Sequence, residues 1–400
     1  MIETQVTVFV IVLMVAAAIA VVVRRIPVPY VTALAVVGLV AGVTSLQQPF
    51  RFTSSLILFV LVPGLLFEAA FNLSWRHLRR NLAATAALAT VGVVVTTVVV
   101  GLMGHFALGL AFPVAMVFGA VVSPTDPVAV VAVFRRLGLP QRLANLVESE
   151  SLLNDGTGAA VFVIALAALA TGHLSPGPAV LEFVRLSVGG CVLGAAIGFA
   201  LSLLALRIDD PAVEITLTAI AAYGGYMAAE YLHVSGILCV VFAGLVMGNF
   251  GRPRGMSPTT QVAVEAFWDY VAFFLNTIVF LLIGLNVPWR DISAHWPLVL
   301  AAAGIVLVSR VLTVYPLLAL LRPVTHAIPL RWQHLLVWSG MRGAIALALL
   351  LSLKGSHAAE FDAIRGLVFG VVLIQIVVQG VTIGPLSRVL IPQPDGAARR

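Results

Sequence analysis

Long apolar runs recur along this 400-residue chain, and they constrain its fold more than any other feature of the sequence. A helix needs about 20 mostly apolar residues to cross the hydrocarbon core of a bilayer. Hydrophobic residues make up 61% of the chain and charged residues only 10%, whereas a typical soluble domain carries about 25% charged residues. Because this composition cannot cover a water-soluble surface, the sequence predicts an all-α polytopic membrane protein.

The apolar runs predict thirteen membrane spans in a single membrane domain, residues 1–400. The first run lacks a preceding basic segment, so an uncleaved helix is expected there rather than a signal peptide. Two six-span halves, residues 1–170 and 212–389, are expected on either side of a linking helix at 180–206, and no soluble regulatory domain is expected. The predicted spans lie at residues 6–23, 30–43, 54–71, 84–103, 113–133, 146–170, 180–206, 212–231, 236–249, 266–285, 296–320, 335–353 and 366–389.

The placement of basic residues predicts the orientation, because cytoplasmic loops of membrane proteins carry an excess of Lys and Arg. If alternate loops are cytoplasmic, 16 of the 23 basic residues lie on that side, including Arg399 and Arg400, and two arginines fall inside spans. The N-terminus is therefore expected outside the cell (inner) membrane and the C-terminus in the cytoplasm. Short basic clusters between apolar runs also argue against a nucleic-acid partner. The five basic residues on the other side are Arg51, Arg185, Arg290, Lys354 and Arg365.

Ionisable side chains inside predicted spans are candidates for function. Each costs several kcal/mol unless it faces a partner or a wet cavity. Glu214, Glu230 and Asp269 lie near span ends, where a solvated or interfacial charge is the expected explanation. The remaining ionisable residues inside spans are Glu68, Asp126, Glu148, Glu150, Asp155, Arg310 and Arg342.

The fifth span is predicted to be broken. Pro124 and Pro127 remove two backbone donors, and the second disfavours a helical conformation at Asp126. A second half-helix is expected to start with Pro127 in its first position and with Asp126 as its N-cap. Irregular backbone inside a bilayer is tolerated where it lines a cavity, so the carbonyl of Thr125 would be free to face a cation. A kink without function is the alternative.

The sixth span carries a polar cluster. Ser151 and Asp155 are one helical turn apart and share a face, as do Glu150 and Asn154. Hard cations prefer oxygen ligands, and Asp155, Ser151 and the Thr125 carbonyl offer a carboxylate, a hydroxyl and a free carbonyl oxygen. Polar contact between helices is the alternative, above all for Asn154.

Three further ionisable residues inside predicted spans, Glu68, Arg310 and Arg342, also have expected roles. Glu68 either completes the cation site or lies near the cytoplasmic end, within reach of Arg76. Arg310 and Arg342 need anions, and they are expected to pair with Glu150 and a neighbouring acid. Arg342 lies in a glycine-punctuated stretch of the twelfth span, which corresponds to the fifth span in the other half. Two interrupted helices at equivalent positions are typical of inverted-repeat transporters, in which this arginine would neutralise free carbonyl ends.

Four separated motifs follow one another along the chain: Ser123-Pro124-Thr125-Asp126-Pro127; Glu150-Ser151-Leu152-Leu153-Asn154-Asp155-Gly156; Phe267-Trp268 with Phe274-Leu275-Asn276-Thr277 and Phe280-Leu281-Leu282-Ile283-Gly284; and Gly340-Met341-Arg342-Gly343-Ala344. Together they resemble the monovalent cation:proton antiporters, specifically the sodium/proton exchanger branch. The resemblance covers nearly all of the chain. It implies a homodimer in which a core bundle moves against a dimerisation bundle.

The resemblance also implies a role for each residue of the site. Asp155 would be the principal carrier of cation and proton. Asp126 and Thr125 would complete the monovalent-cation site on the broken fifth span, with Ser151 and Glu68 as further ligands.

Two further roles concern charge balance. Asn154 matches the Asn-Asp pair of the branch that exchanges one cation for one proton electroneutrally. Glu150 and Arg310 resemble the structural ion pair of that branch.

The expected mechanism is competition in a secondary transporter, not catalysis by an enzyme. Desolvation favours the neutral form of a carboxylate buried at mid-membrane, so Asp155 would hold either a proton or a cation. An empty carboxylate would carry uncompensated charge through the barrier, so only loaded states should cross. The exchange of Na⁺ or Li⁺ for protons would need neither ATP nor a cofactor. K⁺/H⁺ exchange is the alternative among transporters, and a cation channel or sensor is the alternative of a different class. An intramembrane aspartyl protease is disfavoured, because its Gly-x-Gly-Asp stretch is absent.

Overall fold

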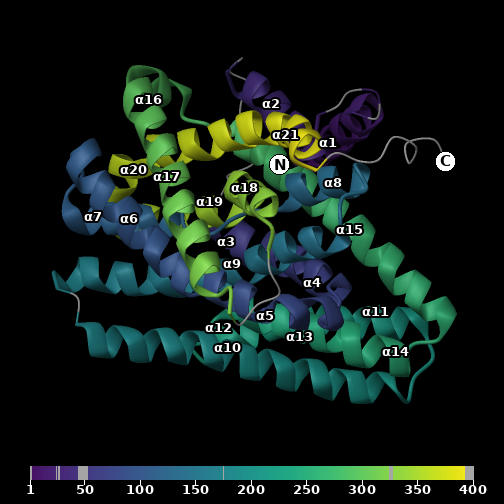
Figure 1. Ribbon diagram of the computed structural model, residues 1–400. Helices are drawn as coiled ribbons and strands as arrows, with labels where there is room; N and C mark the ends of the chain where they lie inside the picture. The colour runs from purple at the N-terminus through teal and green to yellow at the C-terminus, as the bar shows by residue number, and fades with distance from the viewer. Residues whose placement is uncertain are drawn as a thin grey trace.

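The computed structural model describes residues 2–23, 25, 28–43, 53–173, 175–323 and 328–391. Within these ranges all regular secondary structure is helical (Figure 1). Among the described residues, eight helical stretches are long and apolar enough to cross a membrane, and four shorter apolar helices accompany them. The predicted all-α polytopic class is therefore confirmed. The eight stretches are Ser54–Asn72, Trp75–Leu108, Gln141–Thr171, Pro176–Ala205, Gly236–Gly255, Pro258–Leu285, Trp296–Leu320 and Ala358–Leu390.

The first half of the chain and the long helix that follows it contain ten α-helices and one π-helical segment among the described residues. Their bounds are α1 Ile2–Val23, α2 Tyr30–Val43, α3 Ser54–Leu56, η1 Ile57–Leu61, α4 Val62–Asn72, α5 Trp75–Ala89, α6 Val91–Leu108, α7 Phe112–Val121, α8 Val128–Arg136, α9 Gln141–Thr171 and α10 Pro176–Ala205.

The second half continues in the same way. Its elements are α11 Pro211–Ala219, η2 Ile220–Gly224, α12 Gly225–Tyr231, α13 Gly236–Val246, η3 Met247–Gly251, α14 Arg252–Gly255, α15 Pro258–Leu285, α16 Trp289–Ala294, α17 Trp296–Leu320, α18 Leu330–Trp338, α19 Ala344–Ser356, α20 Ala358–Ile374, η4 Gln375–Gln379 and α21 Gly380–Leu390.

Helical segments occupy the ranges predicted from hydropathy, and the two predicted interruptions separate α7 from α8 and α18 from α19. Several helix ends differ from the predicted ones. α5 begins at Trp75 and α15 at Pro258, both before the predicted apolar run. The difference arises because each helix continues through a polar segment that hydropathy alone does not register. Of the basic residues used to predict orientation, Arg24, Arg51, Arg399 and Arg400 lie outside the described residues.

Small residues set the distance between neighbouring helices. α10 packs along α13, and α2 packs along α15. A Cβ atom on Gly194 would collide with the carbonyl oxygen of Cys239, and one on Gly284 would collide with that of Ala35. Glycine at such positions lets two membrane helices approach until their backbones touch. These contacts fix how closely α10 packs on α13 and α2 packs on α15.

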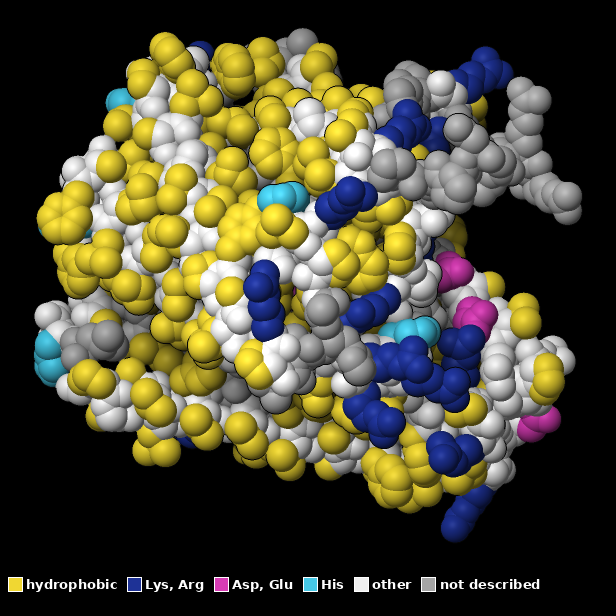
Figure 2. Space-filling view, in the orientation of Figure 1, with side chains coloured by type: hydrophobic (Ala, Val, Ile, Leu, Met, Phe, Trp, Pro, Cys, Tyr) yellow, Lys and Arg dark blue, Asp and Glu magenta, His cyan; other side chains and the backbone are white. Residues whose placement is uncertain are grey.

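The face of the molecule drawn in Figure 2 has an apolar part and a basic part. Figure 2 shows hydrophobic side chains over most of the visible face, with Lys and Arg gathered toward the right of the view. Exposed apolar side chains include Leu181 (71%) and Val192 (62%), both on α10. Such a surface is suited to contact with lipid, which accepts apolar side chains and excludes charged ones.

Glu214 differs from its prediction. α11 places it one turn after the N-cap Asp210, and its side chain is fully buried. Neither of its carboxylate oxygens has a hydrogen-bond partner among the described residues. The expectation of a solvated or interfacial charge is therefore wrong here, because α15 packs over α11. Glu230 and Asp269 are exposed, as expected.

Candidate cation site

The two broken helices meet at their interruptions. Residues 122–127 separate α7 from α8, and residues 339–343 separate α18 from α19. The backbone N–H of Asp126 donates a 2.7 Å hydrogen bond to the carbonyl of Met341. This bond joins the two interruptions directly, and it satisfies a backbone donor that the break would otherwise leave unpaired.

The start of the second half-helix lies one residue later than predicted. Pro127, not Asp126, is the N-cap of α8, because its carbonyl accepts the first helical hydrogen bond, from Val131, at 2.8 Å. Asp126 still acts on this helix end: its Oδ1 accepts the N–H of Val128 at 3.1 Å. The carboxylate therefore caps α8 from one position further out.

Arg342 lies between the C-terminal ends of α7 and α18 and is fully buried. Its Nε donates to the carbonyl of Val122 at 2.6 Å, and its Nη1 donates to the carbonyl of Gly340. Carbonyls at helix C-termini carry partial negative charge, which a cation offsets. The predicted pairing of Arg342 with an acid is wrong, because no ion pair involves it in the described part of the chain. The other expectation for this residue is confirmed, because its guanidinium contacts free carbonyl ends of both interrupted helices.

Asp126 has the complementary position at the N-terminal ends. It caps α8 through Val128, and its carboxylate also lies against Gly343, the residue directly before α19. A Cβ atom on Gly343 would overlap this carboxylate. Helix N-termini carry partial positive charge and stabilise an anion. One acid therefore serves the positive ends of both half-helices, as one arginine serves the negative ends.

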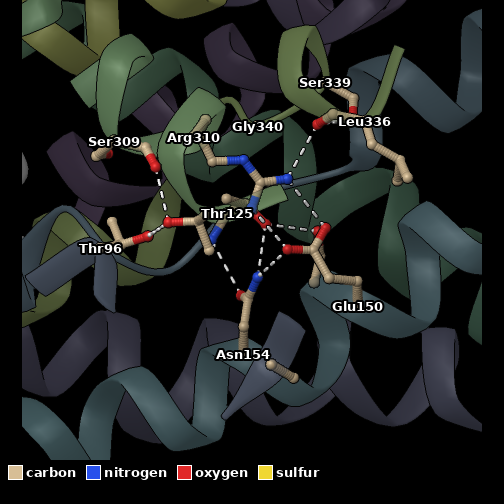
Figure 3. Close-up of polar contacts among 12 residues, drawn as sticks. Thr96, Thr125, Glu150, Asn154, Ser309, Arg310, Leu336, Ser339 and Gly340 are labelled. Carbon is tan, nitrogen blue, oxygen red and sulfur yellow. Dashed lines mark hydrogen bonds and ion pairs between the residues drawn. The ribbon is translucent and has the colours of Figure 1, made fainter. Parts of the chain in front are cut away.

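A buried polar chain links α9 to α17 and α18 (Figure 3). The two guanidinium nitrogens Nη1 and Nη2 of Arg310 donate to the two carboxylate oxygens of Glu150, at 2.7 and 3.3 Å. Nη2 also donates to the carbonyl of Leu336 at 3.0 Å. The side chains of the pair are 5% and 1% exposed. The structure thus brings Glu150 and Arg310 together in a bidentate ion pair, a geometry that is favourable for buried charges.

Asn154 connects this ion pair to the broken fifth span. Its Oδ1 accepts the backbone N–H of Thr125 at 3.1 Å, and its Nδ2 donates to the Thr125 hydroxyl at 2.8 Å and to Glu150 Oε1 at 3.2 Å (Figure 3). The Thr125 hydroxyl is also 2.8 Å from that of Ser151. A neutral amide is needed here, because only an amide both accepts and donates in this way. The cluster fixes the interruption of the fifth span against α9.

A cavity of about 280 Å³ opens beside the crossing. Asp155, Asp126, Thr125 and Glu68 all line it. Asp155 is 8% exposed, and within the described ranges no hydrogen bond or ion pair reaches its carboxylate. A nearly buried acid that faces a cavity without a protein partner is available for a small cation or a proton.

The two remaining predicted ligands are placed differently. Glu68 lines the cavity and accepts a 2.8 Å hydrogen bond from Asn72, and it forms no ion pair with Arg76. Its geometry thus fits the first of its two expected roles. Ser151 lies behind the cavity wall, where its hydroxyl contacts Thr125.

Three polar residues near the site were assigned no role from the sequence. Arg135, 57% exposed, forms a 3.3 Å ion pair with Glu148 where the cavity reaches the end of α8. Asn276 lines the cavity, and Gln375 Oε1 accepts the backbone N–H of Arg342 at 3.1 Å. The signal that could have found Asn276 and Gln375 is the one used for the acids, namely a polar side chain inside an apolar span.

Two interrupted helices that cross, charges that neutralise their ends and a buried acid in a cavity define a membrane transporter of the broken-helix type. The chain belongs to the sodium/hydrogen exchanger family. Residues 10–389 match the family described as "Sodium/hydrogen exchanger, transmembrane", which confirms the resemblance seen in the sequence.

Named relatives cover most of the chain. The Na⁺/H⁺ antiporter ApNhaP of Aphanothece halophytica is 39% identical over 93% of this chain and 72% of its own length. The Na⁺/H⁺ antiporter NhaH of Halobacillus dabanensis is 34% identical over 90% of this chain and 91% of its own length. Among solved structures, the sodium proton antiporter MjNhaP1 of Methanocaldococcus jannaschii matches with a TM-score of 0.80 and 20% identity, over 98% of this chain and 100% of that one. The last likeness concerns the fold alone.

Proposed function

We propose that the chain is a secondary antiporter that exchanges Na⁺ for protons, with the two ions competing for Asp155. Family membership supports the exchange, and both relatives named above are Na⁺/H⁺ antiporters. The observation that carries the mechanism is the Asp155 carboxylate, which is nearly buried, faces a cavity and has no partner among the described residues. Such a group binds one positive ion at a time, and its loaded, neutral form crosses the membrane at the lowest cost.

Asp155, Asp126 and Thr125 form the core of the proposed cation site, because they line the cavity where the broken backbone is exposed to it. Glu68 contributes a further carboxylate from the facing helix α4. Ser151 was expected as a ligand, but its contact with the Thr125 hydroxyl supports a positioning role. Carboxylate and carbonyl oxygens suit a hard cation such as Na⁺.

The charges around the crossing support an electroneutral exchange. Glu150 offsets Arg310 within an ion pair, and Asp126 and Arg342 offset each other at opposite helix ends. Asn154, next to the carrier, is neutral. Glu68 lies on α4, outside the crossing, so Asp155 contributes the remaining negative charge of the crossing itself, which one Na⁺ or one proton neutralises. Equal charge in the two loaded states implies one-for-one exchange, driven by the ion gradients without help from the membrane potential.

We also propose the topology expected from the sequence: thirteen spans, with two inverted six-helix repeats at residues 1–170 and 212–389 around α10. The equivalent interruptions in the fifth and twelfth spans support the repeat. The cavity extends from Asp155 toward the exposed Arg135, on the end predicted to be cytoplasmic. The cavity would therefore open to the cytoplasm. The N-terminus would lie on the outer side of the inner membrane and the C-terminus on its cytoplasmic side. A homodimer, with a core bundle that moves against a dimerisation bundle, completes the proposal.

Proton flux in everted vesicles tests the function. Addition of Na⁺ should drive protons out of acidified vesicles that contain the wild-type chain. Asp155→Asn should abolish this flux, because the amide neither titrates nor carries charge. Flux that persists in the variant would remove Asp155 from its role. K⁺/H⁺ exchange is the second candidate, since the same oxygen ligands accept both ions, and flux with K⁺ but not with Na⁺ would establish it. Flux without any trans ion would indicate a channel.

A further inference from the structure

A second cavity, of about 480 Å³, lies at the other end of the helices that form the cation site. It is lined by Ala159 of α9, Leu349 of α19 and Leu58 of η1, among others. All three helical regions also line the first cavity, through Asp155, Ala346 and Val62 respectively. The two cavities therefore lie along the same group of helices, on either side of the crossing.

The barrier between the two cavities is about one helical turn thick. Asp155 and Ala159 are four positions apart on α9, and Ala346 and Leu349 are three positions apart on α19. At 1.5 Å per residue these steps correspond to roughly 4.5–6 Å. The same spacing occurs at the junction of η1 and α4, where Leu58 lines the second cavity and Val62, four positions later, lines the first. Three separate parts of the chain thus pass from one cavity to the other within a single turn.

Ionisable side chains gather in the wall of the second cavity. Glu182, Arg185, Glu230 and His233 all line it. Arg185 pairs with Glu182 at 3.2 Å, and its Nη2 donates to the carbonyl of His233 at 3.1 Å. Glu230 is exposed, accepts a hydrogen bond from the Tyr226 hydroxyl and forms no ion pair within 4.0 Å in the described part of the chain. The Arg185 charge is thus paired with Glu182, and no arginine offsets the negative charge of Glu230 in the cavity wall.

We propose that the second cavity is the outer vestibule of the ion path and that Glu230 binds monovalent cations in it before they reach the buried site. The inference rests on the proposed exchange function and adds a second, shallow cation site to it. A carboxylate at the mouth of an apolar cavity raises the local concentration of cations. The role requires the negative charge of Glu230 and its place in the wall, and it requires no contact with Asp155.

Side-specific kinetics test the role of Glu230. In proteoliposomes of defined orientation, Na⁺ is varied on the outer or on the inner side and an apparent KM is measured for each. Glu230→Gln should raise the outer-side KM about fivefold, the factor that corresponds to one charge at about 4 Å in water, and leave the inner-side KM unchanged. Glu230→Asp keeps the charge and should restore the wild-type value. Asp362→Asn is the matched control, because it removes an exposed carboxylate on the same predicted side but outside the cavity, and it should change neither KM.

Two results would overturn the proposal for Glu230: an unchanged outer-side KM, or an equal rise on both sides, which would indicate a structural effect. If the wild-type chain shows no exchange at all, the proposed function itself is refuted. The vestibule itself is tested without changing Glu230. Ala159→Cys should react with a membrane-impermeant thiol reagent added from the outer side, above the background from Cys191 and Cys239. Absence of this reaction would show that the cavity is closed to the outer solution, contrary to the proposal.

Discussion

Removal of either partner of the Arg310–Glu150 ion pair should destabilise the protein strongly. Both side chains are at most 5% exposed. Arg310→Met would leave the Glu150 carboxylate in the interior with the Asn154 amide, at 3.2 Å, as its remaining hydrogen-bond donor. Glu150→Met would leave the guanidinium with the carbonyl of Leu336, at 3.0 Å. Loss of one partner of a buried pair costs about 3–5 kcal/mol, because the other charge stays desolvated without compensation.

The double variant Arg310→Met/Glu150→Met provides the decisive comparison. Replacement of a whole buried pair by apolar side chains is often neutral or even stabilising, so the double variant should be more stable than either single variant. Thermal or SDS-induced unfolding of the purified protein measures the three changes. Glu182→Gln is the control, since it removes an exposed ion pair that contributes about 0–1 kcal/mol. If the losses of the two single variants simply add in the double variant, to roughly 6–10 kcal/mol, the desolvation argument is wrong.

Other substitutions test the crossing and the cation site. Gly343→Ala should reduce exchange at least tenfold, because its methyl group would overlap the Asp126 carboxylate, whereas Gly304→Ala, with no atom within 4 Å of the added carbon, should have wild-type flux. Asn154→Asp places a second carboxylate where an amide now donates to Glu150 at 3.2 Å; we expect a lower unfolding temperature, because two carboxylates would then lie side by side in the interior. Ser151→Ala removes one hydrogen bond, worth about 1 kcal/mol, and should raise the KM for Na⁺ only a few-fold; abolished flux would show instead that Ser151 is a ligand. Asp155→Asn should keep or raise the unfolding temperature, since the native carboxylate has no partner to lose; a marked decrease would contradict this.

Local sequence signals predicted the interruptions and the core of the candidate site. Pro124 and Pro127 indicated the break in the fifth span, because proline acts on its own backbone and that of its immediate neighbours. The four-residue spacing from Glu150 to Asn154 placed both on one face of α9, where the structure links them at 3.2 Å. Inference of this kind succeeds when the cause lies within one or two turns of helix.

Long-range packing limited the remaining predictions. The sequence led us to expect that Arg342 neutralises free carbonyl ends, but it could not show that one of them belongs to Val122, 220 residues away in the chain. Glu214 was expected at the interface because its own helix begins nearby, yet α15 covers it. The second cavity could not be anticipated either, because it forms between η1, α9 and α19 and has no signature in any one of them.

The exchange of partners between the two interruptions has a mechanical consequence. Asp126, carried by the first interruption, faces the start of α19, and Arg342, carried by the second, binds the end of α7. Each broken helix thus carries the charge that neutralises the other, so the charges of Asp126 and Arg342 balance within the pair. If the two broken helices move together across the bilayer, Asp126 and Arg342 stay next to the helix ends that they neutralise. The two directions of movement would then differ only in the ion bound to Asp155.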